Sequence, residues 1–303
     1  MPQLELLGER LGLPGRIITK AGDNVTRLES LSIICRRLSE SSKLLTIANE
    51  FGRSPAAISR IVKHVAPLLY GMHKSKLYFN RRLITSRIAS YCSAVNENGA
   101  PLTNVWAFID GTKQYIARPT PRSEYSDRYE NLQRSVYNGH PRRHCLNWQA
   151  HTTPDGIIQS VYGPVEGRRH DSTVLSYSKI MDALRDDVDG TLEGRYVYGD
   201  PAYGCNRFMI CPFASPAADS NERRFNARMS KVREAVEWSF GRLKILWPFV
   251  FDDKKMQVRR TPVGKLFYMA VLFTNCHYCM QPMGNQISMY FGLQPPTLDE
   301  YFG

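Results

Sequence analysis

The chain has 303 residues, of which 43% are hydrophobic, and this content excludes a wholly disordered protein. Lys and Arg number 40 against 28 Asp and Glu, and the resulting net charge of +12 favours polyanionic partners, nucleic acid first. Seven irregularly spaced cysteines do not predict a disulfide framework, and the longest apolar stretch, KLFYMAVLF, is too short to cross a membrane. The first residues, MPQLELLGER, include acidic side chains and no apolar run, so we expect an intracellular protein without a secretory leader.

Residues 1–95 are predicted to form a helical DNA-binding domain, because apolar residues recur at helical spacing through most of this region. Leu44–Phe51 predicts a short helix that Gly52 ends, and Ser54 followed by Pro55 predicts the start of the next helix. Two helices joined by a tight turn indicate a helix-turn-helix motif. Its second helix exposes the candidate DNA-binding residues Ser59, Arg60 and Lys63. A plain helical subdomain with a solvated basic face is the alternative that the sequence leaves open.

The rest of the chain is predicted to be an α/β domain. Residues 96–103, which include NENGAP, are expected to be a linker, residues 104–285 the domain, and residues 286–303 a C-terminal tail. The stretch CLNWQAHTTPDGIIQSVYG predicts a hairpin turned at Pro-Asp-Gly, and HDSTVLSYSKIMDALRDD predicts one helix. We therefore expect a mixed sheet with helices packed on it.

Two acidic residues follow apolar strands in this domain. Val105–Ile109 ends at Asp110, and Tyr196–Tyr198 is followed by Gly199 and Asp200. Either acid alone is accounted for as a turn residue, since Asp readily bonds its own backbone. Ligands of open α/β sheets, however, collect at the carboxyl ends of the strands. Two acids placed alike at those ends therefore favour a functional site.

A third acid lies in SKVREAVEWSFGRLKILW, which is predicted to be a helix. Arg233, Glu237 and Lys244 are four and seven residues apart, so they share one stripe of it, whereas Glu234 lies off that stripe. A surface pair between Arg233 and Glu237 is the alternative interpretation, and it stabilises a helix by only about 0.3–0.5 kcal/mol.

Three carboxylates on a sheet-and-helix scaffold predict a site for two Mg²⁺ or Mn²⁺ ions, because hard divalent ions prefer oxygen ligands. Asp110, Asp200 and Glu237 are the candidate ligands and catalytic residues. Two such ions together bind the attacking water and the leaving oxygen of a phosphodiester. Arg233 and Lys244 are then candidates for phosphate contact. The pattern predicts a nuclease acting on double-stranded DNA.

These segments resemble the PIF/Harbinger-type transposases and their domesticated nuclease relatives, which belong to the DDE superfamily endonucleases. LLTIANEFGRSPAAISRIVKHV, FIDGT, YNGHPRRHCLNWQ, PDG, GRRHDSTVL, GDPAYG and REAVEWSFGRLK occur in that family's order. The last is similar to an R-x(3)-E-x(6)-K signature, here Arg233, Glu237 and Lys244. The resemblance covers most of the chain.

The resemblance implies an RNase H-like fold with a five-stranded mixed sheet, Asp110 on the first strand, Asp200 after the fourth and Glu237 on a late helix. His170 and Asp171 match the family's HD pair and are expected to support the site. A Myb-like DNA-binding partner protein and a nuclear location are implied as well, and a homo-oligomer is a further expectation. The rival class is a domesticated DNA-binding protein that keeps the fold and does no chemistry.

Three further signals are weaker. The stretch from Arg118 to Arg143 interleaves basic and aromatic residues, which suits distorted or single-stranded DNA but equally a solvated loop. It contains Arg122, Tyr125, Arg128, Tyr129, Arg134, Tyr137, Arg142 and Arg143. Of these, Arg142 and Arg143 are the candidate DNA contacts.

IDGT also suggests a haloacid-dehalogenase-type phosphatase, but Phe108 occupies the position of its nucleophile. CHYC has zinc-like spacing without a second pair downstream, so structural thiols are expected.

Overall fold

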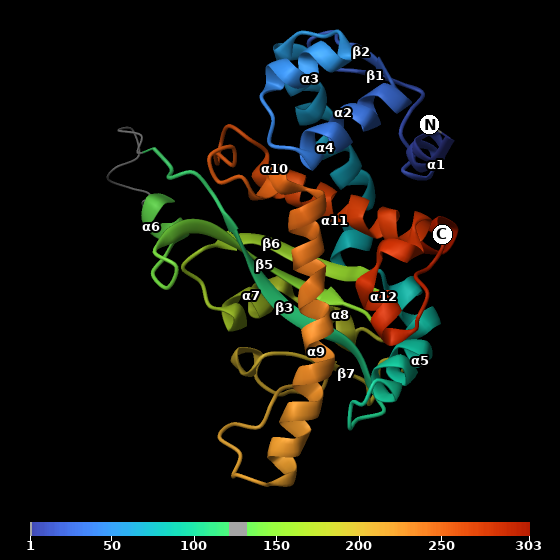
Figure 1. The fold of residues 1–303 in the computed structure, drawn as a ribbon, viewed down its shortest axis with the longest axis vertical. Coiled ribbons are helices and arrows are strands. Elements are labelled where there is room, and N and C mark those ends of the chain that lie inside the picture. Colours follow the sequence, from blue (N-terminus) through green and yellow to red (C-terminus); the bar gives the residue numbers. More distant parts are fainter. Residues whose placement is uncertain (1, 121–131) are drawn as a thin grey trace.

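The structure is a computed structural model that describes residues 2–120 and 132–303. Arg122, Tyr125, Arg128 and Tyr129 lie outside the described residues. Figure 1 shows a central sheet with helices on both of its faces and a cluster of N-terminal helices at one end. No helix within the described ranges has the length and apolar character needed to cross a membrane.

The N-terminal region contains five helices and a two-stranded hairpin among the described residues. They are α1 (Pro2–Arg10), β1 (Arg16–Ile18), β2 (Asn24–Thr26), α2 (Arg27–Ser39), α3 (Leu44–Phe51), α4 (Pro55–Tyr78) and α5 (Arg81–Glu97). Strands β1 and β2 pair antiparallel and were not anticipated from the sequence, because three-residue strands leave almost no alternation to detect.

The predicted boundary between α3 and α4 is confirmed in detail. Gly52 follows α3 in the left-handed conformation, with φ of 62°, which glycine adopts without steric cost. The Ser54 side chain accepts a hydrogen bond from the backbone N–H of Ala57, and Pro55 occupies the first position of α4. The two helices therefore meet at a tight turn, and α4 continues well beyond it, while the helix-turn-helix motif itself stays a prediction.

The α/β part follows with six strands among the described residues. They are β3 (Val105–Tyr115), β4 (Tyr137–Asn138), β5 (Arg143–Thr152), β6 (Ile158–Glu166), β7 (Tyr196–Tyr198) and β8 (Met209–Ile210). The main order across the sheet is β6-β5-β3-β7-β8, and the short β4 pairs with β5. Strand β5 pairs antiparallel with both β3 and β6, whereas β7 is parallel to β3 and β8 is parallel to β7. This mixed sheet is consistent with an RNase H-like domain.

Helices cover both faces of the sheet. The elements after β6 are α7 (Asp171–Ser178), α8 (Ile180–Arg185), η2 (Pro201–Tyr203), α9 (Asn221–Leu246), α10 (Pro248–Phe251), α11 (Val263–Met280), η3 (Pro282–Gly284), α12 (Gln286–Phe291) and α13 (Leu298–Phe302), and α6 (Leu132–Val136) precedes β4. On one face, α5 and α8 pack against β3, and the buried cluster there includes Ile88 of α5 and Ile109 of β3. On the other face, α4 and α11 contact β6 and α9 contacts β3, and Figure 1 shows α9 crossing in front of the sheet.

The single helix expected over HDSTVLSYSKIMDALRDD is wrong, because the structure divides it into α7 and α8. Lys179 separates the two helices in a left-handed conformation, with φ of 56°. The Ser178 hydroxyl accepts a hydrogen bond from the N–H of Ile180, at 3.2 Å, in place of the regular helical ladder.

One buried cluster crosses the expected boundary at residue 95. It contains Leu31 and Ile61 from the N-terminal helices together with Trp148 of β5 and Phe267 of α11. The last two rings stack with centroids 3.9 Å apart. Residues 286–303, expected as a tail, form α12 and α13, and Tyr301 belongs to the same cluster. The N-terminal helices, the sheet and the C-terminal helices thus share a core.

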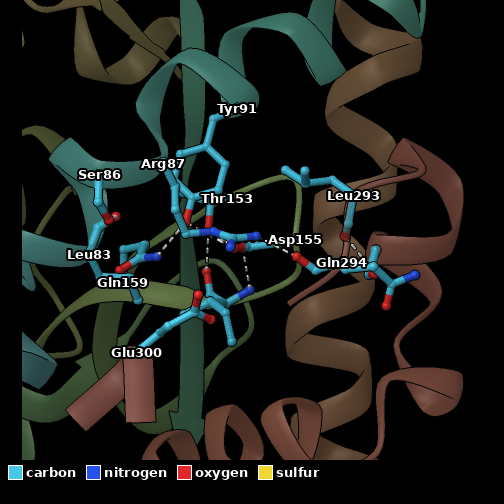
Figure 2. A network of polar contacts seen from close by, with 12 residues as sticks. Leu83, Ser86, Arg87, Tyr91, Thr153, Asp155, Gln159, Leu293, Gln294 and Glu300 are labelled. Atoms are coloured by element: carbon cyan, nitrogen blue, oxygen red, sulfur yellow. Dashed lines mark hydrogen bonds and ion pairs between the residues drawn. The ribbon is translucent and has the colours of Figure 1, made fainter. Parts of the chain in front are cut away.

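A buried polar network also joins these parts (Figure 2). Asp155, in the turn between β5 and β6, is fully buried, and its Oδ2 lies 3.3 Å from Arg87 Nε and accepts a hydrogen bond of 2.9 Å from the Tyr91 hydroxyl. Thr153 donates to the other oxygen of Asp155 at 2.6 Å. Arg87 also donates to the carbonyl of Gln294, so α5, the hairpin turn and the C-terminal region are fastened together.

Candidate active site

The register of two parallel strands places Asp110 and Asp200. Phe108 of β3 pairs with Tyr198 of β7, and both are buried with ring centroids 6.4 Å apart. Each acid lies two residues further along. Because side chains alternate along a strand, Asp110 lies on the same face of β3 as Phe108, and Asp200 continues from Tyr198 in extended backbone. The two predicted acids therefore lie side by side, with Asp200 just after the end of β7 and Asp110 within β3. The expectation that this strand ends at Asp110 is wrong, because β3 stays paired with β5 as far as Tyr115.

Helix α9 brings the third acid to this face. Met229 and Val232 of α9 belong to the same buried cluster as Phe108 and Tyr198. The helix therefore crosses the two strands just before their acids. One turn beyond Val232, Glu237 lies on the same face of the molecule with its side chain half exposed. Arg233 Nη2 lies 3.1 Å from Glu237 Oε1, which is the i,i+4 pair that the sequence left open as the alternative interpretation.

Two glycines next to the acids leave room for Tyr203. A Cβ at Gly199 would lie 2.6 Å from Ile109 Cγ2 and 3.0 Å from Tyr203 Cδ2, so no larger residue fits there. A Cβ at Gly111 would lie 3.2 Å from Asp171 Oδ1 and 3.4 Å from the Tyr203 hydroxyl. Asp171, at the start of α7, and Tyr203 thus converge on the backbone beside Asp110.

The electrostatics of the group follow from this crowding. Burial raises the pKa of Asp110 above its usual range, and the charges of Glu237 and Asp171 raise it further. The N–H of Gly111, 2.9 Å from Asp110 Oδ1, and the charge of Arg233 act in the opposite direction. Burial likewise raises the pKa of Tyr203, with further contributions from Asp171, Asp110 and Asp200. The carboxylates of Asp110, Asp171, Asp200 and Glu237 and the Arg233 guanidinium therefore lie close enough to affect the pKa values of Asp110 and Tyr203.

Asp200 also has the turn role that its sequence context suggested. Its Oδ1 accepts a hydrogen bond of 2.9 Å from the N–H of Ala202 and caps the short helix η2. The same turn carries Tyr203 toward Gly111. The two interpretations of Asp200 are therefore compatible, because the cap is made by one oxygen of the carboxylate.

The donor chemistry of the group suits a hard cation. Asp110, Asp171, Asp200 and Glu237 offer carboxylate oxygens, which Mg²⁺ and Mn²⁺ prefer over nitrogen and sulfur. Within the ranges that the structure describes, no three Asp, Glu, His or Cys side chains are placed to hold one ion. Glu237 is instead paired with Arg233. The chemistry of the donors fits a divalent ion, and the side chains do not form a closed ligand set.

Two of the expected supporting residues lie outside the group. His170 is exposed at the N-terminus of α7 and makes no capping hydrogen bond with its side chain. Lys244 is exposed two turns beyond Glu237, and its Nζ lies 6.0 Å from the ring centroid of Phe251. Asp171 and Arg233, by contrast, lie close enough to Asp110 to affect its pKa.

The candidate DNA-binding residues fall into two places. Ser59 is half-buried on α4, Lys63 is exposed, and Arg60 makes two hydrogen bonds of 2.7 Å with Asp23 beside the β1–β2 hairpin. At the other place, Arg142 is exposed before β5 with a positive φ of 53°. Its neighbour Arg143 pairs with Asp253 and lies over the ring of Tyr115, 4.0 Å from the centroid.

Tyr203 is the residue of this site that sequence reasoning missed. Its hydroxyl is buried and has no hydrogen-bond partner among the described residues, although it lies among three carboxylates. It lies in GDPAYG, but a tyrosine three residues after an acid is not a sequence pattern that predicts a functional role. The available signal was the pair of glycines, Gly111 and Gly199, whose missing side chains make space for the ring and hydroxyl.

The expectation of structural thiols stays a prediction. The seven are free, and Cys276 is buried within α11 while Cys279 lies one turn later. Burial raises the pKa of the Cys276 thiol well above its usual range, which disfavours the thiolate that zinc requires.

Comparison with known proteins agrees with this arrangement. No curated protein and no solved structure matches the chain. A family model described as DDE superfamily endonuclease matches residues 109–275, more than half of the chain. The match begins on β3 one residue before Asp110 and runs through the segments that carry Asp171, Asp200 and Glu237 into α11. The chain therefore belongs to the DDE superfamily endonucleases.

Proposed function

We propose that this protein is a divalent-metal-dependent DNA endonuclease of the PIF/Harbinger transposase type that acts in the nucleus. The observation that carries the proposal is the register of β3 and β7, which sets Asp110 beside Asp200 under the helix that bears Glu237. The basic character of the chain supports a polyanionic substrate.

In this proposal Asp110, Asp200 and Glu237 hold two Mg²⁺ or Mn²⁺ ions. When bound, the ions supply charge neutralisation for the phosphate and make a coordinated water more acidic. Asp171 adds negative charge beside Asp110, and its position at the start of α7 is fixed by that helix. Arg233 counters the acids without metal, and release of Glu237 from Arg233 leaves a guanidinium for the phosphate. The Tyr203 hydroxyl is placed to donate a hydrogen bond to an oxygen in the site.

The second candidate is a DNA-binding protein that keeps the fold and does no chemistry. The ion pair between Arg233 and Glu237, together with the lack of a closed ligand set in the described residues, favours it. In that case Arg233 serves as the permanent counter-ion of a disused acidic site.

A nicking assay on supercoiled plasmid separates the two candidates. The full chain is incubated with Mg²⁺, Mn²⁺ or EDTA, and conversion to open-circular DNA is followed under single-turnover conditions. If the protein is a nuclease, metal-dependent nicking is expected, and Asp200→Asn should abolish it. Glu234→Gln should retain it, because Glu234 is exposed on α9 and is not one of the proposed ligands. DNA binding without nicking in any metal, with a Myb-like partner protein supplied, supports the non-catalytic candidate.

A further inference from the structure

Two adjacent grooves with basic walls lie where the N-terminal helices meet the α/β part. The first, about 610 Å³, separates the tip of the β1–β2 hairpin from α4, and its basic lining residues are Lys20, Arg60, Lys63 and His64. The second, about 580 Å³, separates α4 from the loop before α11 and the first turn of α11, and its basic lining residues are Lys63, Arg259, Arg260 and Lys265. Lys63 lines both grooves, so they form one surface, which we call the Lys63 surface.

The Lys63 surface is predominantly basic. Among the described residues no acidic one lines either groove, although Asp23 pairs with Arg60 beside the first groove, and Lys20, Lys63, Arg260 and Lys265 are all exposed. The remaining lining is small or apolar, including Ala21, Pro67 and Leu68 in the first groove. Basic side chains next to small or apolar ones suit a sugar–phosphate backbone, because the phosphates pair with the cations and the sugars pack on the apolar residues.

Polar contacts hold the walls of this surface in place. Asp23 ties the hairpin to α4 through Arg60, at 2.7 Å. On the other side, Lys255 Nζ donates to the carbonyls of Ser41 and Ser42 at 3.2 and 3.3 Å, which fastens the loop after α10 to the segment before α3. The hairpin, α4 and the loop between α10 and α11 are therefore tied to neighbouring segments by polar contacts.

The Lys63 surface is linked along the chain to the candidate active site. Figure 1 shows α9, which bears Glu237, running from the sheet up to α10. The loop between α10 and α11 carries Arg260, and the first turn of α11 carries Lys265, whereas no described residue of α9 lines either groove. Arg60, in contrast, is paired with Asp23, so its charge is partly neutralised. It is therefore less available to DNA phosphates than expected for a residue of a DNA-binding helix.

We propose that the Lys63 surface binds the sugar–phosphate backbone of duplex DNA, with contacts shared between α4, the loop before α11 and the first turn of α11. The inference rests on the proposed function for its substrate class and adds the place where the duplex is held. Backbone contact positions a duplex without reading its sequence. The loop before α11 is therefore a DNA contact that lies outside the helix-turn-helix region.

The test is a salt titration of DNA binding by the full chain. Fluorescence anisotropy of a labelled mixed-sequence duplex is measured in EDTA between 50 and 200 mM salt, so that cleavage does not intervene. Each phosphate contact contributes about −0.9 to the slope of log K against log salt. The double variant Arg260→Gln/Lys265→Gln is expected to have a slope shallower by about 1.8. Over that range wild type then loses about tenfold more affinity than the variant.

A gain-of-affinity variant guards against misfolding as an explanation. Asp23→Asn removes the carboxylate that occupies Arg60, so tighter binding at low salt and a slope steeper by about 0.9 are expected. Lys74→Gln is the matched control, because Lys74 is exposed on α4 but lines neither groove. An unchanged slope in the double variant, or an equal loss in Lys74→Gln, overturns the proposal.

The outcome is separable from that of the proposed function. If wild type nicks plasmid while the double variant keeps the wild-type slope, the endonuclease stands and the Lys63 surface is not the DNA site. If the slopes change as expected but wild type never nicks, the Lys63 surface stands and the non-catalytic candidate is favoured.

Discussion

Asp110 and Asp200 each lie two residues beyond Phe108 and Tyr198, which pair directly across the parallel strands β3 and β7. Equal offsets from a paired position place both acids at one level of the sheet. Neither side chain is positioned by the other, because each is set by its own strand and by a backbone hydrogen bond, from Gly111 and Ala202 respectively. Removal of one acid is therefore expected to leave the other in place.

Asp110→Asn and Asp200→Asn are each expected to reduce metal-dependent nicking by about a thousandfold or more, as expected when a residue of a catalytic unit is lost. Because residues that act as a unit are not additive, the double variant should be little worse than either single variant. Glu234→Gln serves as the control. The single-turnover rate of plasmid nicking by folded proteins provides the measurement, and near wild-type nicking by Asp200→Asn would leave Asp200 with only its turn role.

Much of this site could be predicted from the sequence because strand ends and helix stripes are local patterns. Asp110 and Asp200 follow apolar runs that end in glycine or proline, and Glu237 shares a helical stripe with Arg233. The approach of Tyr203 to Gly111 could not be predicted in this way. It depends on the path of the chain through η2 and on the space left by Gly199, which are tertiary properties.

The fold shows the same division between local and tertiary information. The α3–α4 boundary was confirmed because Gly52, Ser54 and Pro55 each act on their own backbone. The break at Lys179 was missed because lysine does not favour a left-handed conformation. The shared core of Leu31, Trp148 and Tyr301 was missed too, since composition at residues 96–103 indicates a linker but does not reveal which surfaces pack together.

Tyr203→Phe is expected to separate the chemistry of Tyr203 from its packing. An unsatisfied buried hydroxyl stabilises nothing, so its removal should leave the thermal midpoint unchanged or slightly raised. Loss of a hydrogen-bond donor in the site should reduce nicking by about tenfold or more and shift the Mn²⁺ concentration for half-maximal nicking. Tyr177→Phe is the comparison, because the Tyr177 side chain is exposed on α7. Unchanged rate and metal dependence in Tyr203→Phe would show that the tyrosine only fills space.

His151 is expected to make the protein sensitive to mild acid. It is 1% exposed on β5, and burial lowers its pKa from 6.5 to about 4. The folded state therefore favours neutral imidazole, and the unfolded chain takes up the proton first. This contribution to stability is complete above pH 6.5 and is lost as the pH falls toward 4. Its full size is about 3 kcal/mol, from the shift in pKa.

His151→Gln should therefore lose less stability than wild type between pH 6.5 and pH 4. Urea denaturation of both proteins at several pH values in this window provides the comparison. His140→Gln, which changes an exposed histidine, should follow the wild-type curve. Parallel curves for His151→Gln and wild type would mean that another group governs the acid sensitivity.

Asp155 is expected to be the most sensitive polar position for stability. Its carboxylate is fully buried and accepts hydrogen bonds from Tyr91 and Thr153 while it pairs with Arg87 (Figure 2). Asp155→Asn removes the charge that compensates the Arg87 guanidinium, and breaking a buried pair in this way destabilises a protein by about 3–5 kcal/mol. Tyr91→Phe removes one hydrogen bond and should cost about 1–3 kcal/mol.

A double-mutant cycle with Asp155→Asn and Arg87→Gln tests the coupling directly. In Asp155→Asn the Arg87 guanidinium is left without its counter-ion, and Arg87→Gln removes that unpaired charge. The double variant should therefore be less destabilised than the sum of the single variants. Arg185→Gln, which changes an exposed arginine paired with Asp182, should add independently to Asp155→Asn. Additive effects of Asp155→Asn and Arg87→Gln would show that the ion pair contributes no coupling energy and that Asp155 acts through its hydrogen bonds to the hairpin turn alone.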